Sequence, residues 1–174
     1  MAGKYVLTGG PGAGKTTLIR SLAEQGFYTG AEVPRLLIQK LMQENSQDLP
    51  WLNRTAFETR VIIDKIADYQ KSPSDRDCFF DRGMPDSIGY MRLDNAVVPS
   101  EMDAAARSYR YEVIFMLPPW EEIYVNDNER REDFQKAERI YGLLCGVYKD
   151  YGYEPIIVPK GSREERLEFI KSHI

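Results

Sequence analysis

The stretch Gly9-Gly10-Pro11-Gly12-Ala13-Gly14-Lys15-Thr16 matches the pattern G-x-x-x-x-G-K-[ST]. It directly follows the apolar run Lys4 to Thr8 and leads into a helix-like segment, Lys15 to Gln25. Glycines allow successive backbone N–H groups to turn inward as an anion-binding nest, and the N-terminus of the following helix adds partial positive charge. The pattern therefore predicts a strand, loop and helix that together bind a triphosphate.

Each polar residue of this loop has an expected role. The Lys15 ammonium would reach the β- and γ-phosphates, and the Thr16 hydroxyl would ligate Mg²⁺. ATP and Mg²⁺ are therefore the predicted cofactors. The predicted nucleotide-binding residues are Gly9, Gly10, Pro11, Gly12, Ala13, Gly14, Lys15, Thr16 and Thr17. The alternative is a glycine-rich turn that is followed by a lysine with no ligand.

Length and composition predict one globular domain over residues 1–174. Hydrophobic residues make up 43% of the chain and charged residues 29%, which excludes disordered, collagen-like and disulfide-scaffold proteins. Strand-like apolar runs alternate with helix-like periodic segments, a pattern typical of an α/β fold with a parallel sheet. The five expected strands are Lys4 to Thr8, Phe27 to Ala31, Asp77 to Phe80, Glu112 to Leu117 and Pro155 to Val158.

Charge and residue usage exclude several other classes. The net charge of −4 and the pI of about 5.2 argue against a nucleic-acid partner. Two cysteines in apolar runs and a single histidine, His173, cannot form a zinc site or a cysteine–histidine nucleophile. The first apolar run is too short for a signal peptide or a membrane span. We therefore expect a cytoplasmic protein without a membrane span.

Two acids follow strands of the predicted sheet. Asp81 ends the run Cys78-Phe79-Phe80 and is the expected Mg²⁺ partner, because a phosphate-binding loop needs an acid at the end of a neighbouring strand. Glu32 follows the second strand and is expected to accept a proton from an acceptor hydroxyl or to hold that hydroxyl in line. The alternatives are a turn or capping acid for Asp81 and a solvated acid before a helix for Glu32.

Arginines accompany both acids and the next predicted helix. Arg82 follows Asp81, and Arg35 lies three residues after Glu32, so both are candidate acceptor contacts at the same sheet edge. Arg54 and Arg60 lie on the helix-like segment Trp51 to Gln70 and are further acceptor candidates. The alternative for these two is a surface position, with Arg54 paired to Glu58 at i,i+4.

A polar segment, residues 126–133, is the expected lid. It carries Arg130 and Arg131 between acids and asparagines, ahead of the amphipathic pattern Gln135 to Tyr151. Arginines that close over a transferred phosphoryl group stabilise its developing negative charge. We predict a catalytic role for both, and the alternative is a solvated cluster of ion pairs.

Two serines are expected to cap helices. Ser100-Glu101-Met102-Asp103 and Ser162-Arg163-Glu164-Glu165 each place an acid three residues after a serine. Pro34, Pro50 and the pair Pro118-Pro119 are expected in first turns of helices.

In this order, the motifs resemble a family of small P-loop ATPases that includes the NadR ribosylnicotinamide kinase domain and the TRPL translocation defect protein. The resemblance covers nearly the whole chain. The motifs that carry it are the P-loop, Glu32-Val33-Pro34-Arg35, Asp81-Arg82-Gly83 with Pro85-Asp86-Ser87, Leu117-Pro118-Pro119-Trp120, Arg130-Arg131-Glu132-Asp133, the helix ending in Tyr148, Pro155-Ile156-Ile157-Val158-Pro159 and Glu164-Glu165-Arg166. It implies a three-layer nucleoside- and nucleotide-kinase fold with sheet order 2-3-1-4-5 and an arginine-bearing lid.

The expected function is phosphoryl transfer from Mg²⁺·ATP to a small nucleoside-like or other hydroxyl acceptor. The alternative is a nucleotide-binding ATPase or switch module that signals NTP occupancy to a protein partner. The residues Arg82-Gly83-Met84 after Asp81 do not form the D-x-x-G of a GTPase, and the length leaves no room for the helical domain of a mechanical AAA+ ATPase. The acceptor, the choice of ATP over GTP and the oligomeric state stay open.

Overall fold

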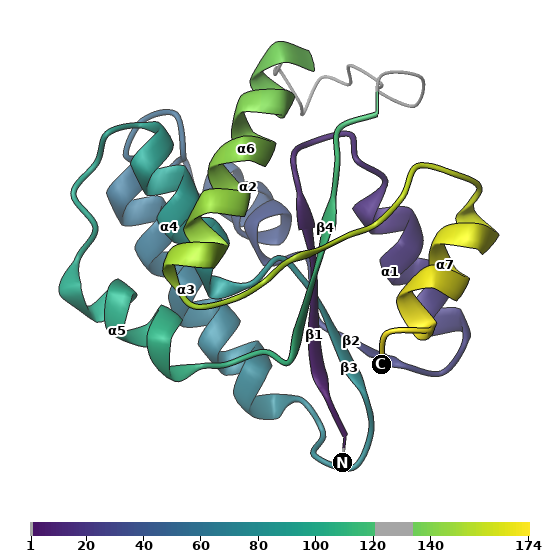
Figure 1. Ribbon diagram of the computed structural model, residues 1–174. Coiled ribbons are helices and arrows are strands. Elements are labelled where there is room, and N and C mark those ends of the chain that lie inside the picture. Colours follow the sequence, from purple (N-terminus) through teal and green to yellow (C-terminus); the bar gives the residue numbers. More distant parts are fainter. Residues whose placement is uncertain (1, 121–133) are drawn as a thin grey trace.

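A five-stranded parallel sheet forms the centre of the computed structural model, which describes residues 2–120 and 134–174 (Figure 1). The strands are β1 (Lys4–Gly9), β2 (Tyr28–Thr29), β3 (Cys78–Asp81), β4 (Val113–Leu117) and β5 (Ile156–Ile157). All their pairings are parallel, and the order across the sheet is β2-β3-β1-β4-β5. This order confirms the predicted fold class, and each strand falls in or next to the run predicted for it.

Helices cover both faces of the sheet, which gives three layers. In Figure 1, α1 and α7 lie on one side of the strands, and α3, α4, α5 and α6 lie on the other. The helices are α1 (Lys15–Glu24), α2 (Val33–Gln43), α3 (Arg54–Lys71), α4 (Met84–Leu93), α5 (Ser100–Ser108), α6 (Phe134–Asp150) and α7 (Arg163–Lys171). Parallel strands need such crossover helices, because each strand must return to the same end before it pairs again.

The alternation of side chains along each strand divides the core into two clusters. Val6 and Phe80 face α4 and α6, in a cluster with Ile88 and Leu144. The next residue along β1, Leu7, belongs to the opposite cluster with the side chains of α1 and α7. Both faces of β1 and β3 are therefore buried, which explains their nearly continuous apolar sequences.

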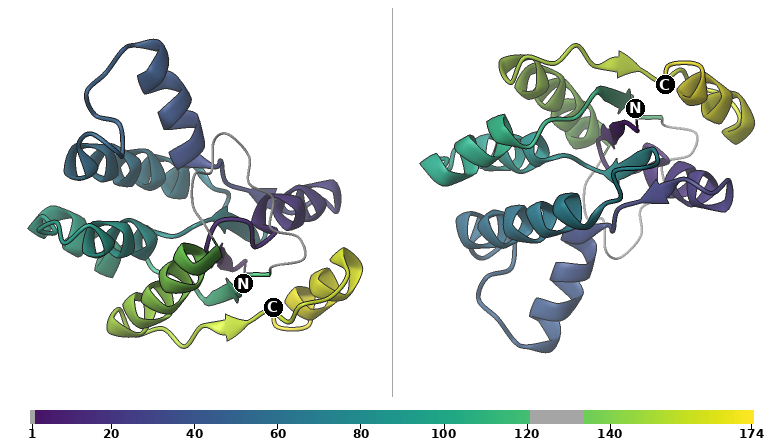
Figure 2. Two further views of the ribbon diagram at one scale, coloured as in Figure 1. Left: turned by 90° about the horizontal axis from the view of Figure 1, so that it is seen from above. Right: turned by 90° about the horizontal axis from the view of Figure 1, so that it is seen from below.

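A third cluster holds α2 against α3. Val33, Leu37 and Leu41 of α2 pack on Phe57 and Val61 of α3. Figure 2 shows α2 and the loop after it at the margin of the molecule, beyond α3. In the described part of the chain, every helix is too short or too polar to cross a bilayer.

Of the two serines predicted to cap helices, Ser162 does so and Ser100 does not. Ser162 accepts from the N–H of Glu165, whose carboxylate accepts from the N–H of Ser162, so the predicted capping box forms. Ser100 is instead the first helical residue, and Pro99 stands at the N-cap without a side-chain bond. The prediction for Ser100 was wrong because the preceding proline already holds the extended backbone that a cap requires.

The predicted positions of the prolines in first turns of helices are confirmed for one proline and wrong for another. Pro34 and Pro85 lie in the first turns of α2 and α4, where a missing N–H leaves no helix bond unmade. Pro50 does not start a helix, because Asn53 caps α3 by accepting from the N–H of Ala56. A helix start after Pro118-Pro119 would fall on residues 121–133, which lie outside the described residues.

Candidate functional site

The glycine-rich loop has the backbone conformation of an anion-binding nest. Gly12 has φ 72° and Gly14 has φ 83°, values in the left-handed region that glycine adopts without a steric penalty. Alternating right- and left-handed residues turn successive N–H groups toward one side of the loop. The first turn of α1 begins directly after Gly14, so its free N–H groups and dipole face the same region.

Lys15 lies at the start of α1 with its ammonium over this loop. Its Nζ donates to the carbonyl oxygens of Gly9 at 3.0 Å and Gly10 at 2.7 Å, and the side chain is buried. Thr16 follows with a partly exposed side chain, and Thr17 is exposed. The positive charge therefore stands beside the inward-facing amides, where a polyphosphate needs neutralisation.

Asp81 ends β3 beside the strand that leads into the loop. Parallel pairing places it opposite Leu7 of β1, so its carboxylate and the P-loop emerge at the same sheet edge. The residue is 4% exposed, and its Oδ1 is a buried atom without a hydrogen-bond partner. An unpartnered buried carboxylate oxygen is costly unless a cation or donor completes it. Oxygen atoms of Asp81 and Thr16 are the ligand type that Mg²⁺ prefers, so the residues present fit the predicted metal.

Arg82 adopts a backbone conformation that is rare for a residue with a side chain. Its φ is 70°, and the strain of such a position is of order 1 kcal/mol or more. Its guanidinium donates to the Gly9 carbonyl at 3.2 Å and to the Asp86 carboxylate at 3.3 Å. It also stands 5.3 Å from the centre of the Tyr90 ring. Arg82 thus connects β3 to the P-loop itself.

Asp86 is the centre of a buried network for which no role was predicted. It is 1% exposed and accepts hydrogen bonds from the Thr8 hydroxyl at 2.5 Å, the Tyr148 hydroxyl at 2.6 Å and the Gly83 N–H at 2.9 Å. The network joins the ends of β1 and β3 to α4 and α6. Its one local signal is the position of Asp86 in the first turn of a helix, where an acid caps the preceding N–H.

Glu58 and Lys65 of α3 form a second buried charged group. The sequence named Glu58 only as a surface partner of Arg54 and did not single out Lys65. The Lys65 ammonium donates to the Gly83 carbonyl at 2.6 Å. Burial lowers the pKa of Lys65, although the nearby charges of Asp86 and Glu58 act in the opposite direction. Burial raises the pKa of Glu58, although the charge of Lys65 opposes this shift. The signal that could have revealed their burial is their helical spacing from Ile62, which places both on the apolar face of the helix.

Of the other acceptor candidates, some lie at the carboxyl edge of the sheet and others lie on the surface. Glu32 precedes α2 at the carboxyl end of β2, and Arg35 lies 3.7 Å from it. Arg54 forms the i,i+4 pair with Glu58 at 3.4 Å that its alternative named, and it also pairs with Asp94 at 2.6 Å. The pair does not lie at the surface, because Arg54 is only 21% exposed and Glu58 is buried.

Arg60 is exposed and lies 2.6 Å from Asp48. Arg54 shares the Tyr90 ring with Arg82, at 5.5 Å from the ring centre. Arg54 and Arg82 thus lie near the same aromatic side chain. Arg130, Arg131 and the predicted lid 126–133 lie outside the described residues.

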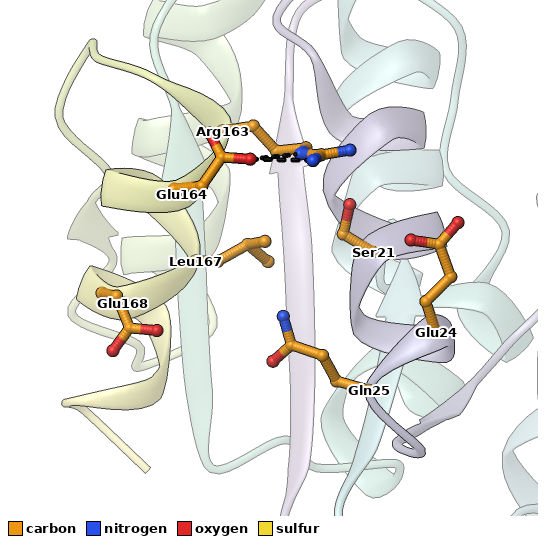
Figure 3. Close-up of a pocket in the computed structure, with 7 residues that line it drawn as sticks. All are labelled: Ser21, Glu24, Gln25, Arg163, Glu164, Leu167 and Glu168. Atoms are coloured by element: carbon orange, nitrogen blue, oxygen red, sulfur yellow. Dashed lines mark hydrogen bonds and ion pairs between the residues drawn. The ribbon is translucent and has the colours of Figure 1, made fainter.

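A shallow pocket between α1 and α7 lies away from the P-loop. Figure 3 shows its lining, which includes Ser21, Glu24 and Gln25 from the C-terminal half of α1. Glu164 and Glu168 of α7 add negative charge on the other side. Arg163 also lines the pocket but is paired with Glu164, so three carboxylates outweigh one guanidinium and the lining disfavours a phosphate.

Solved structures with a similar fold include the NadR protein, a thymidylate kinase and a shikimate kinase. The NadR protein in complex with NR matches with a TM-score of 0.71 at 16% identity, over 98% of this chain and 50% of NadR. Thymidylate kinase from Ehrlichia chaffeensis matches with a TM-score of 0.66 at 17% identity, over 99% of both chains. Shikimate kinase from Acinetobacter baumannii, in complex with shikimate, matches with 0.64 at 16% identity, over 99% of this chain and 93% of that one.

The chain spans about half the length of NadR. No curated protein matches it by sequence. The predicted resemblance to the NadR-type P-loop proteins is confirmed by fold. The family described as AAA domain matches residues 4–166, which include the P-loop, both strand-end acids and the predicted lid, and the chain belongs to this family.

Proposed function

We propose that the protein is an Mg²⁺·ATP-dependent kinase that transfers the γ-phosphoryl group to a hydroxyl of a small, nucleoside-like acceptor. One observation carries the proposal: the unpartnered, buried Oδ1 of Asp81 stands at the sheet edge next to a P-loop whose glycines have nest conformation. The likeness to kinases that act on nucleotides and on shikimate supports a small-molecule acceptor.

The side chains of the site have separate tasks in this reaction. The nest amides and Lys15 hold the β- and γ-phosphates, and Thr16 with Asp81 would hold Mg²⁺, which neutralises phosphate charge when bound. The acceptor oxygen attacks the γ-phosphorus, the bond to the β,γ-bridging oxygen breaks, and ADP leaves. Glu32 accepts the hydroxyl proton, and Arg130 and Arg131 stabilise the transferred group.

The acceptor site extends from Glu32 along the same edge of the sheet. Arg35, Arg54 and Arg82 are the proposed acceptor contacts, since guanidinium groups donate to the polar or anionic groups of a small molecule; each also pairs with a carboxylate of the protein. The Tyr90 ring lies 5.5 Å from the Arg54 guanidinium and 5.3 Å from that of Arg82, so it connects these two candidate acceptor contacts. Arg60 is a weaker candidate because its side chain is the most exposed of the four arginines, at 47%.

The test is ADP release from Mg²⁺·ATP across a library of nucleosides and small hydroxyl metabolites. We expect slow ATP loss alone and fast loss with one acceptor class. Glu32→Gln should retain ATP affinity while transfer falls by ~10²–10⁴, because the basic oxygen is gone. The exposed Glu44 at the end of α2 provides the control variant, Glu44→Gln, which should transfer at the wild-type rate.

Asp81→Asn separates the metal from the acceptor. It should raise the Mg²⁺ concentration needed for every reaction of the nucleotide, whereas Asp75→Asn, an exposed position before the same strand, should not. ATP turnover that no acceptor accelerates, together with ATP-dependent binding of a protein, would instead support the switch module. Transfer by Glu32→Gln within a few-fold of wild type would reduce Glu32 to a charge at a helix start.

A further inference from the structure

Arg166 of α7 is a buried guanidinium that contacts the P-loop from outside. The residue is 5% exposed, and its Nη2 donates to the Ala13 carbonyl oxygen at 3.1 Å. Its planar group also faces the Trp120 ring, with Cζ 5.8 Å from the ring centre. The Nε of Arg166 is buried without a partner. No task in the proposed reaction uses this side chain.

Packing of α7 on α1 fixes where this guanidinium stands. Leu167 and Ile170 of α7 belong to the same core cluster as Leu18 and Leu22 of α1. Figure 3 shows Leu167 directed between the two helices, and Figure 1 shows the helices beside each other. Because α1 begins at the end of the P-loop, this packing couples the position of Arg166 to the loop.

The hydrogen bond to Ala13 determines the direction of the next amide. In a trans peptide, the carbonyl of one residue and the N–H of the following residue point in opposite directions. The Ala13 carbonyl points to Arg166 on the outside of the loop, so the Gly14 N–H points to the opposite side. Gly14 has the positive φ of the nest, and its rotation would otherwise be unrestrained by a side chain.

The charge of Arg166 has no counter-ion among the described residues. The exposed Arg163, one turn earlier on α7, lies 2.8 Å from Glu164, and the partly buried Arg82 lies 3.3 Å from Asp86. For Arg166 the partners found are a carbonyl oxygen and a ring face. A buried charge without a counter-ion is costly, and a polyphosphate bound inside the loop would offset that cost.

We propose that Arg166 is a positioning residue of the nucleotide site, which orients the Ala13–Gly14 peptide so that the Gly14 amide donates to a bound polyphosphate. This inference rests on the proposed function, because it requires that the P-loop binds such a ligand. It adds a contribution from the C-terminal helix, far along the chain from the motif.

Calorimetry with inorganic tripolyphosphate and with ATP, both with Mg²⁺, tests the proposal. Arg166→Gln should weaken both ligands about tenfold, because a charge-assisted contact that holds a phosphate-binding amide is lost. The two losses should be equal, since tripolyphosphate has no base. Arg163→Gln is the matched control on the same helix and should bind both ligands like wild type.

The Gly14 amide provides a readout that a merely structural role would not change. In ¹H–¹⁵N spectra, tripolyphosphate should shift the Gly14 amide strongly in wild type and weakly in Arg166→Gln. Arg166→Lys retains a donor and the charge, so it should restore part of the affinity and of the shift. If Arg166→Gln does not fold, Arg166→Lys alone tests the proposal, with a Gly14 shift between zero and the wild-type value.

Two negative results differ in meaning. A wild-type protein that binds neither ATP nor tripolyphosphate would refute the proposed function and this inference together. Wild-type binding with an unchanged affinity and an unchanged Gly14 shift in a folded Arg166 variant would refute the inference alone. A lower melting temperature with unchanged binding would assign Arg166 to packing of α7.

Discussion

Replacement of Asp86 by asparagine should destabilise the protein more than any other isosteric change near the site. The two carboxylate oxygens divide their donors: Oδ1 accepts from Thr8 and Arg82, and Oδ2 accepts from Tyr148 and the Gly83 N–H. Hydroxyl groups can rotate and accept from an amide NH₂, but a guanidinium and a backbone N–H can only donate. Either orientation of asparagine therefore sets its NH₂ against an obligate donor.

The magnitude follows from the charges that remain. Loss of the carboxylate leaves the partly buried Arg82 and the buried Lys65 with less compensation, and removal of one partner from a buried ionic group costs about 3–5 kcal/mol. Tyr148→Phe removes one hydroxyl bond to the carboxylate while Gly83 retains its acceptor, so it should cost only about 1.5–3 kcal/mol.

Urea unfolding followed by circular dichroism measures both losses at pH 7. The double variant completes a cycle and should show coupling between the two positions, because they share a hydrogen bond of 2.6 Å. A loss below about 1 kcal/mol for Asp86→Asn would refute the reasoning. So would a loss for Tyr148→Phe that equals the loss for Asp86→Asn, since the charge would then contribute nothing.

Three other predictions follow from the site and the core. Lys15→Ala should weaken Mg²⁺·ATP binding by about 10- to 100-fold in calorimetry with the melting temperature retained; equal affinity would exclude a phosphate contact. Arg130→Ala or Arg131→Ala should lower kcat and kcat/KM together by roughly 10²-fold; a higher KM for ATP alone would indicate an ordinary binding contact. Burial raises the pKa of Tyr5 from 10.0 to about 12, so between these pH values the unfolded chain loses this proton while the folded state retains it. The free energy of unfolding should therefore fall as pH rises from 10 toward 12. A Tyr5→Phe variant with an equally steep loss of stability would contradict this.

Local sequence determined the chemistry of the loop and the places of the strands. A glycine-rich turn between an apolar run and a helix is a property of neighbouring residues, so the P-loop and Lys15 could be recognised directly. Asp81 could be placed because the carboxyl ends of parallel strands share one edge. The sheet order came from family resemblance, since pairing of distant strands leaves no signal in the spacing of one sequence.

Tertiary structure alone decided which buried polar groups meet. Tyr148 and Asp86 are 62 positions apart, and Arg166 and Ala13 are 153 apart. Such contacts depend on how α6 packs on α4 and α7 on α1, and thus on side-chain volumes summed over whole helix faces. In the sequence, Lys65 and Arg166 look like ordinary helix charges. In the folded protein Lys65 donates to the Gly83 carbonyl and Arg166 to the Ala13 carbonyl. Tertiary packing decides these partners, because a buried cation needs a hydrogen-bond acceptor and only the folded backbone brings one close.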